Sequence, residues 1–310
     1  MTMLTHIDFT GVSKPNVQHF FDPHTWTLTY VVSDPLSRRC AIIDPVLDLD
    51  YPAGTLTTEI ADQVVAYVND EGLSVDYIIE THVHADHLTS ALYLQKKLGG
   101  KILIGAQITT VQETFARVYN EPSNFPANGS QFDVMVGDGD QFMLGDIECH
   151  AFHVPGHTPA CMAYLFGDAL FVGDTLFMPD GGTARCDFPG GDAKTLFHSI
   201  KRLLTLPDET RMFVCHDYQP NGRELQYETT VGMQRAENIH VNDAINEESF
   251  VSMRETRDAT LGMPTLILPS LQVNMRAGHL PPPDTDGKLF LRVPINVFAG
   301  DDLSFLAAGK

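Results

Sequence analysis

The stretch THVHADH, residues 81–87, gathers three histidines and an aspartate directly after an apolar run. In an extended segment, residues two apart face the same side, so His82, His84 and Asp86 project together. His87 then falls at the start of an expected helix. Imidazole and carboxylate groups together suit a borderline cation such as zinc or iron. This spacing therefore predicts a metal site.

Three later residues are also of metal-ligand type and also follow expected strands. His157 lies in VPGHTPA, Asp174 in FVGDTLF and His216 in FVCHDY, each after an expected strand. Taken singly, each is an ordinary turn residue. Because strand ends held by tight turns present side chains rigidly, the three together predict the remainder of one ligand set.

Hydrophobic periodicity indicates an α/β chain in which strands occur in hairpins and also alternate with helices. Strands are expected over 25–32, 39–43, 75–81, 101–105 and 211–215, and helices over 57–70, 85–98, 108–119, 193–205 and 223–239. The polar stretch 120–140 is expected to be a loop insertion. We predict a catalytic domain over 1–240 and a C-terminal extension over 241–310 that packs on it and carries one more helix.

Composition limits the classes of partner and the compartment that we expect for this protein. The chain has 20 basic and 40 acidic residues and a formal charge of −20, which disfavours nucleic acid and anionic membranes. The five dispersed cysteines contain no C-x-x-C pair, which is typical of a reducing compartment. The start shows no secretory pattern, and no apolar run approaches a membrane span. The expected location is the cytoplasm.

The motifs THVHADH, PGHTPA, GDTLF and CHDY, in this order and at these separations, resemble the metallo-β-lactamase fold superfamily. The resemblance extends over about 25–240. It implies an αββα four-layer sandwich with the metal site at one edge of the two sheets.

Within that superfamily, GDTLFMPDGGTARCDF and the ending LPPP…LRVPIN resemble the persulfide dioxygenases. The resemblance implies one Fe(II) per chain held by His82, His157 and Asp174. Two imidazoles and one carboxylate leave positions open for O2 and a sulfur substrate. The implied reaction oxidises glutathione persulfide with O2 to sulfite and glutathione.

The resemblance also suggests roles for the remaining ligand-type residues. His84, Asp86, His87 and His216 would surround a vacant second metal position, with Asp86 and His216 as candidate catalytic groups. The alternative is a dizinc thioester hydrolase of the glyoxalase II type, in which all seven residues bind metal and Asp174 bridges. A third hypothesis is a non-catalytic metal-binding or persulfide-sensing protein.

Substrate contacts are expected from Arg185, Tyr218 and Asn296. The expected partner is then a small-molecule substrate, and the sequence also allows a homodimer. Persulfide dioxygenases carry N-P-R after the penultimate helix, whereas this chain has Asn238-Ile239-His240 and lacks that arginine. Cys161 and Cys186 are interpreted as packing residues, because the chemistry needs no protein thiol.

Overall fold

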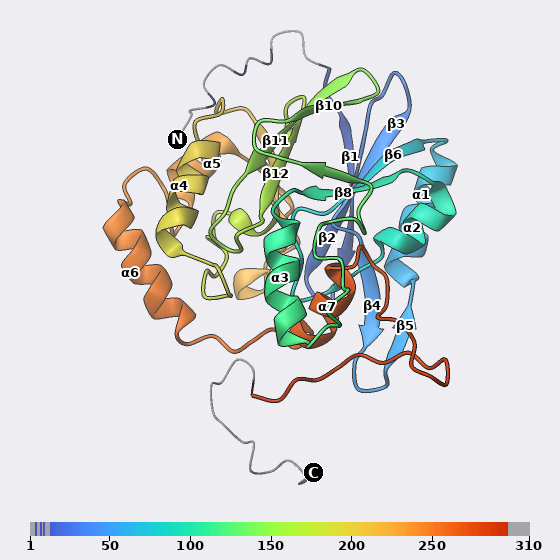
Figure 1. Ribbon diagram of the computed structural model, residues 1–310. Helices are drawn as coiled ribbons and strands as arrows, with labels where there is room; N and C mark the ends of the chain where they lie inside the picture. Colours follow the sequence, from blue (N-terminus) through green and yellow to red (C-terminus); the bar gives the residue numbers. More distant parts are fainter. Residues whose placement is uncertain (1–3, 5–6, 8, 10–12, 297–310) are drawn as a thin grey trace.

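The computed structural model describes residues 4, 7, 9 and 13–296. Two mixed six-stranded sheets form its centre (Figure 1). The first runs in the order β1 (Asn16–Asp22), β2 (Thr27–Ser33), β3 (Arg39–Ile43), β6 (Ser74–Ile79), β8 (Lys101–Gly105) and β9 (Val134–Val136). The second runs in the order β10 (Gln141–Leu144), β11 (Ile147–His153), β12 (Met162–Phe166), β13 (Ala169–Phe171), β14 (Arg211–Phe213) and β15 (Glu228–Thr230).

A small third sheet and the helices complete the structure. The small sheet joins β5 (Thr55–Thr57), β4 (Val46–Asp50) and β7 (Leu88–Thr89). The helices are α1 (Glu59–Asp70), α2 (Ala91–Leu98), α3 (Ile108–Val118), α4 (Ala193–Leu203), α5 (Val231–Glu237), α6 (Glu247–Asp258) and α7 (Ile267–Asn274). Two 3-10 turns, η1 (Gly173–Thr175) and η2 (Pro220–Gly222), lie between them. No helix of the described part is long and apolar enough to cross a bilayer.

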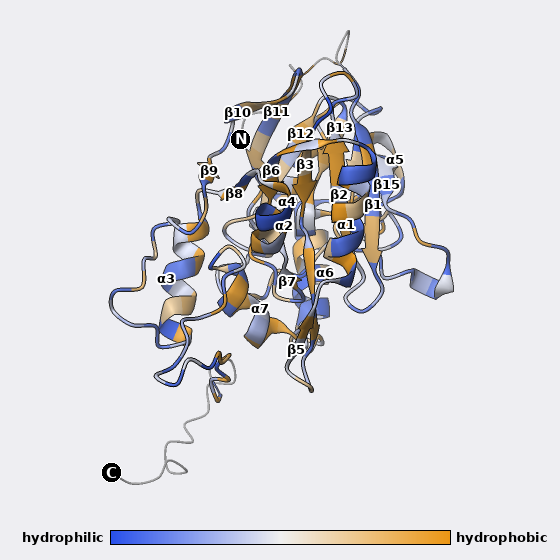
Figure 2. Cartoon of the chain, turned by 90° about the vertical axis from the view of Figure 1, so that its right-hand side faces the viewer, coloured by the Kyte–Doolittle hydropathy of each residue, from blue (hydrophilic) through white to orange (hydrophobic). Residues whose placement is uncertain are grey.

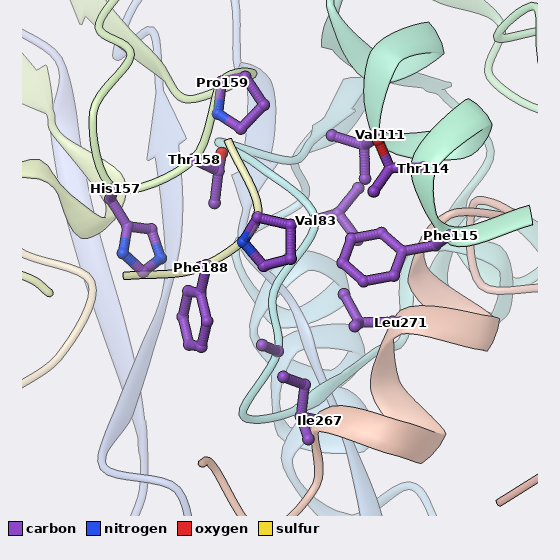
Figure 3. A pocket seen from close by; sticks show the side chains of 12 residues that line it. Val83, Val111, Thr114, Phe115, His157, Thr158, Pro159, Phe188, Ile267 and Leu271 are labelled. Carbon is purple, nitrogen blue, oxygen red and sulfur yellow. The ribbon is translucent and has the colours of Figure 1, made fainter. Parts of the chain in front are cut away.

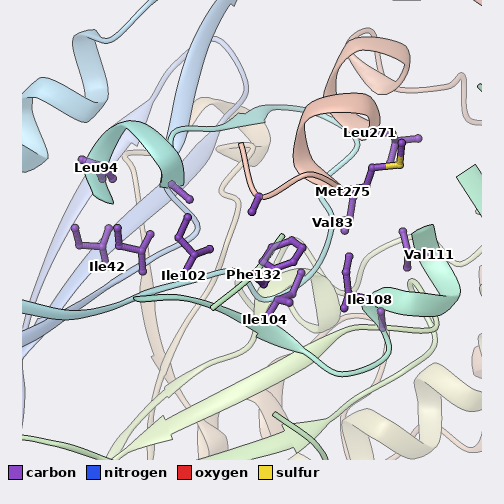
Figure 4. Packing of buried hydrophobic residues seen from close by; sticks show 14 of the residues in the cluster. Ile42, Val83, Leu94, Ile102, Ile104, Ile108, Val111, Phe132, Leu271 and Met275 are labelled. Carbon is purple, nitrogen blue, oxygen red and sulfur yellow. The ribbon is translucent and has the colours of Figure 1, made fainter. Parts of the chain in front are cut away.

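Buried apolar side chains divide into three clusters that define four layers. One cluster lies between the two sheets, where Tyr30 of β2 meets Phe171 and Phe213 of the second sheet. A second joins the first sheet to α1, α2, α3 and α7 (Figure 4). The third joins the second sheet to α4, α5 and α6. The expected αββα sandwich is therefore present.

Alternation along β2 shows how the sequence builds these layers. Leu28, Tyr30 and Val32 face the other sheet, while Val31 faces the helices of its own side. Side chains of a strand alternate between faces, so a strand buried on both sides is apolar throughout. Figure 2 shows this in the hydrophobic colour of β2, β3 and β13 and in the mixed colour of α3.

Three sequence-based expectations about elements between residues 85 and 239 are wrong. The helix expected over 85–98 begins only at Ala91, because the preceding segment pairs as β7 with β4. The helix expected over 223–239 is replaced by β15 and the short α5. The stretch 120–140 is not all loop, since β9 adds to the first sheet and Phe132 is buried.

The C-terminal segment folds back onto the sandwich. Phe250 of α6 lies 5.4 Å, centroid to centroid, from Phe197 of α4. Leu271 of α7 joins the apolar cluster of the first sheet. The segment therefore contributes two helices where the sequence suggested one, and both stand near the edge that carries the metal-ligating motifs.

Candidate metal centre

The loop that follows β6 carries the first group of ligand-type residues. His82, His84 and His87 are all buried, with at most 1% of their surface exposed. Their rings are close together, with centroid distances of 4.0 Å between His82 and His84 and 4.2 Å between His84 and His87. Contrary to expectation, His87 does not start a helix.

Asn274, at the end of α7, holds this loop open. Its amide Nδ2 donates to the carbonyl oxygens of His84 and His87, each at 2.8 Å. Its Oδ1 accepts the backbone N–H of Thr89 at 2.8 Å. These bonds satisfy backbone groups that a helix would otherwise pair internally, which explains why the predicted helix starts later.

The second sheet supplies the other ligands from the ends of three strands. His157 follows β11, Asp174 lies in η1 after β13, and His216 follows β14. Strands β13 and β14 are parallel neighbours, so their carboxyl ends lie at the same edge. Gly156 permits the turn before His157: its φ is +142°, and a Cβ there would lie 2.3 Å from the Cα of Leu196.

The two groups of ligands meet at Asp174. Its Oδ2 lies 3.6 Å from Nε2 of His157 and 3.9 Å from Nε2 of His82. Its Oδ1 lies 3.3 Å from Nε2 of His216, which is also 3.2 Å from Oδ2 of Asp86. The structure therefore brings together the seven residues that the sequence singled out.

Unpaired polar atoms at the centre are of the kinds that bind a cation. His84 Nδ1, His87 Nε2, Asp174 Oδ1 and His216 Nε2 are buried and have no hydrogen-bond partner in the described part of the chain. Unpaired buried polar atoms are costly, so their convergence indicates a ligand that they share. Ligand atoms of His82, His157 and Asp174 all lie within 4.8 Å of one another, and so do those of His84, Asp86 and His87. Nitrogen and carboxylate donors fit iron or zinc.

The opposite ring nitrogens are oriented by nearby groups. His157 Nδ1 donates to the carbonyl oxygen of Arg185 at 2.7 Å, and His87 Nδ1 to that of Leu88 at 3.1 Å. Donation from Nδ1 leaves the lone pair on Nε2, which is the nitrogen that faces the centre. His84 is reversed: its Nε2 is 3.0 Å from Asp44 Oδ1, so Nδ1 is left for a metal.

Asp44 and Glu80 are buried carboxylates that the sequence reading missed. Asp44 accepts the N–H of Thr81 at 2.7 Å and its hydroxyl at 2.8 Å. Glu80 accepts the hydroxyl of Thr89 and lies 3.7 Å from Nε2 of His84. Asp44 directly follows β3 and precedes Pro45, a strand-end position like those of the other ligands. Such hydrogen-bonded partners orient metal-binding imidazoles.

Burial and neighbouring charge set the protonation of the centre. Burial lowers the pKa of His82 and of His84 well below the ordinary value, and adjacent imidazoles lower it further. Both rings are therefore neutral, as metal ligands must be. Burial raises the pKa of Asp174. For His216, burial works against protonation, but Asp86 and Asp174 outweigh it and raise the pKa.

A cleft of about 1000 Å³ opens above the metal centre and is lined by Asp86, His157 and Asp174. Tyr218 and Arg185, two of the predicted substrate contacts, line it as well. The residues that line it in the described part of the chain do not include Asn296. The substrate roles of these three residues stay predictions.

Arg185 has partners within the protein. Its guanidinium binds both carboxylate oxygens of Asp187 at 2.6 Å and donates to the carbonyl of Gly262 at 2.6 Å. His240, which stands where an arginine was expected, supplies no charge. It is buried, its Nδ1 accepts the N–H of Thr183 at 3.0 Å, and burial lowers its pKa to about 4.

A second, mostly apolar pocket adjoins His157. Figure 3 shows the rings of His157 and Phe188 on one side and Val111, Phe115 and Leu271 of α3 and α7 across from them. This lining keeps water away from one side of a metal-ligand candidate, which strengthens electrostatic interactions there.

The cysteines near the site are poor nucleophiles. Cys161 and Cys186 are free and buried, and burial raises the pKa of each thiol to about 12. Because the thiolate is the reactive form, this agrees with their interpretation as packing residues.

Comparison with known proteins gives one consistent family. The pattern of the metallo-beta-lactamase superfamily matches residues 27–216. The chain is 51% identical to a probable metallo-hydrolase of Burkholderia pseudomallei, over 90% of this chain and 99% of that protein. It is 43% identical to glyoxylase B2 of Dictyostelium discoideum, over 92% of this chain and 98% of that one.

Similarity extends to persulfide dioxygenases. The mitochondrial persulfide dioxygenase ETHE1 of Mus musculus is 30% identical over 86% of this chain and 90% of its own. The crystal structure of ETHE1 from Myxococcus xanthus superposes with a TM-score of 0.67 at 29% identity, over 85% of this chain and 100% of that chain. With its sandwich of two sheets and its seven convergent ligand residues, the chain belongs to the metallo-β-lactamase superfamily.

Proposed function

We propose that this protein is a persulfide dioxygenase that oxidises glutathione persulfide with O2 to sulfite and glutathione. The observation that carries the proposal is the set of His82, His157 and Asp174, whose ligand atoms all lie within 4.8 Å of one another, with His157 and Asp174 lining the cleft. Two imidazoles and one carboxylate on one side of a metal are the arrangement of non-haem Fe(II) oxygenases.

The metal and the chain have separate tasks. When bound, iron(II) supplies open coordination positions and a redox couple through which O2 and a persulfide sulfur can react. The net reaction consumes one O2 and one water and releases the thiol, sulfite and two protons. With a single iron the second metal position is vacant, and Nε2 of His216, 3.2 Å from Oδ2 of Asp86, is then available to hold a proton. This makes it, with Asp86, the proposed acid–base pair for the water and the released protons.

The outer part of the site accommodates the thiol carrier. The ring of Tyr218 is stacked on that of His216, with centroids 5.7 Å apart, and it meets Phe177 edge-on at 5.6 Å. Tyr218 is half exposed, so its ring forms a face of the cleft next to the proposed acid–base pair. The similarity to ETHE1 over most of the chain supports the proposed persulfide dioxygenase activity.

The buried, free state of all five cysteines agrees with a reducing compartment, and we propose the cytoplasm.

A dizinc thioester hydrolase is the second candidate, and two observations favour it. Asp174 directs one oxygen toward His157 and the other toward His216, as a bridging carboxylate does. His87 Nε2 is buried and has no partner. The similarity to glyoxylase B2 points the same way. Zinc has no accessible redox change and would activate water for attack on a carbonyl.

Metal content and two assays separate the candidates. Protein purified without added metal should contain about one iron per chain, and with a glutathione persulfide source it should consume O2 and release sulfite. It should hydrolyse S-lactoylglutathione only slowly. Two zinc ions per chain, with thioester turnover of about 10 s⁻¹ or more and no persulfide-dependent O2 uptake, would establish the hydrolase instead. A His157→Ala variant controls for adventitious metal.

A further inference from the structure

Three arginines line the cleft above the metal centre: Arg185, Arg254 and Arg257. The guanidinium of Arg185 is held by Asp187 and Gly262. Arg254 is buried, binds Asp258 at 2.6 Å and donates to the carbonyl of Thr183 at 2.9 Å. Within the described part of the chain, the structure records no hydrogen bond or ion pair from the guanidinium of Arg257. It is therefore the cation that the cleft leaves available.

The position of Arg257 on α6 places its charge against the cleft wall. It lies three residues after Arg254 and so on the same face of the helix. Through the carbonyl of Thr183, Arg254 ties that face to the segment 183–185. The carbonyl of Arg185, at the end of this segment, accepts the bond from His157 Nδ1. The helix face that carries Arg257 is thus connected to the metal centre by a short chain of contacts.

The cleft is polarised, because carboxylates line it from other elements. Asp48 and Asp50 of β4 and Glu59 at the start of α1 all belong to its lining. No ion pair of these three carboxylates is recorded in the described part of the chain. Burial raises the pKa of Asp48, and the neighbouring carboxylates of Asp22 and Glu59 raise it further, because these acidic groups lie close together on this side of the cleft.

Aromatic rings lie between the metal centre and the solvent. Trp26 and Tyr218 are both about half exposed, and their ring centroids are 6.1 Å apart. Trp26 has a φ of 55°, a backbone conformation that is costly for a large side chain. The N–H of Asp217 donates to the carbonyl oxygen of Trp26 and so stabilises this conformation. Backbone strain of this kind is found at ligand-binding surfaces. Trp26 is also the single tryptophan of the chain.

We propose that Arg257 receives a carboxylate of the thiol carrier and that the β4–α1 side receives its ammonium group. The proposal rests on the proposed function, since it names what that site selects. A carrier with both charges, such as a small γ-glutamyl peptide thiol, then fits the cleft. A phosphorylated carrier such as coenzyme A brings only negative charge to the acidic side and is rejected.

Binding of a non-reactive analogue tests this independently of turnover. Trp26 fluorescence and calorimetry, on protein as purified with its metal, give the Kd of S-methylglutathione. Arg257→Gln should raise that Kd about tenfold, since the bond is charge-assisted but exposed. Arg257→Lys should recover part of the loss. Arg117→Gln, an exposed change of the same charge on α3 away from the cleft, should leave the Kd unchanged.

Chemical variation of the ligand completes the test. The dimethyl ester of S-methylglutathione should bind wild type and Arg257→Gln equally, the N-acetyl analogue should bind both more weakly, and coenzyme A should not compete. Arg185→Gln should raise the Kd less than Arg257→Gln does.

Equal Kd values for S-methylglutathione in wild type and Arg257→Gln, or no binding to wild type, would overturn the proposal even if persulfide-dependent O2 uptake is present. If the protein shows no persulfide-dependent O2 uptake but the Kd values for S-methylglutathione follow the predicted pattern, the proposed reaction is wrong and Arg257 remains the carboxylate contact.

Discussion

The metal centre and the walls of the cleft differ in how completely their polar groups are paired. At the centre, His82, His84 and His87 are buried, and the nitrogen of each that faces away from the centre has a protein partner. On the walls, Arg257, Asp50 and Glu59 are exposed. At these three histidines the pairing leaves free the nitrogen that faces the metal position, whereas on the walls Arg257, Asp50 and Glu59 keep whole charges for a ligand.

This difference has a physical cause. A metal ion tolerates little displacement of its ligands, so hydrogen bonds to their far sides must fix both tautomer and direction. A flexible thiol carrier can be bound by a few charges in water-accessible positions, at lower energy per contact. Changes at the centre should therefore remove function, while changes on the walls should shift affinity.

The largest expected effect tests the centre itself. His82→Ala, His157→Ala and Asp174→Ala should each abolish metal retention and reduce activity by about a thousandfold or more, roughly 4 kcal/mol. His216→Ala should keep iron while losing activity. Metal analysis and O2 uptake measure both quantities, and His198→Ala on the surface is the matched control. Loss of iron from His216→Ala as complete as from His157→Ala would refute the mononuclear assignment.

A smaller effect is expected one layer further out. Asn274→Ala removes three hydrogen bonds and leaves buried backbone groups of His84, His87 and Thr89 unpaired. We expect metal affinity to fall about 10–100-fold and the free energy of unfolding by about 2–4 kcal/mol. Chelator competition and urea unfolding measure these changes, with Asn69→Ala on the exposed face of α1 as control. Unchanged affinity would show that the loop holds its shape without α7.

The smallest expected effect concerns the wall behind Thr183. The pKa of His240 is about 4 in the folded protein and about 6.5 when unfolded. Between these values the unfolded state binds more protons, so the free energy of unfolding must decrease as pH falls from about 6.5 to 4. The stabilising contribution is complete above pH 6.5 and lost below 4.

His240→Asn keeps an acceptor for the Thr183 N–H but cannot titrate. Between pH 7 and 4.5 its free energy of unfolding should fall by about 2 kcal/mol less than that of the wild type. Urea unfolding of both proteins is measured with a chelator present, so that loss of metal at low pH does not add to the effect of His240 protonation on the free energy of unfolding. Identical pH dependence in the two proteins would mean that His240 protonates freely in the folded state.

Local sequence was sufficient wherever one element carried its own signal. The alternation in 25–32 and 39–43 predicted β2 and β3, and helical spacing predicted α1, α3 and α4. His82, His84, Asp86 and His87 were recognisable because they are adjacent in sequence, and their spacing is itself the geometry of a ligand loop. The superfamily followed from these residues together with three motifs at strand ends.

Tertiary structure decided what depended on distant segments. The helix expected from residue 85 starts late because Asn274, nearly two hundred residues away, takes the backbone groups of the loop. Arg185 satisfied a local motif, yet Asp187 and Gly262 occupy its guanidinium. Among the cleft arginines of the described residues, Arg257 is the one whose guanidinium has no recorded partner. Sequence alone determined which side chains could bind a metal, because ligand chemistry belongs to the residue. Which charges remain free for a substrate depends on the partners that folding brings to each of them, and only the packed chain fixes those partners.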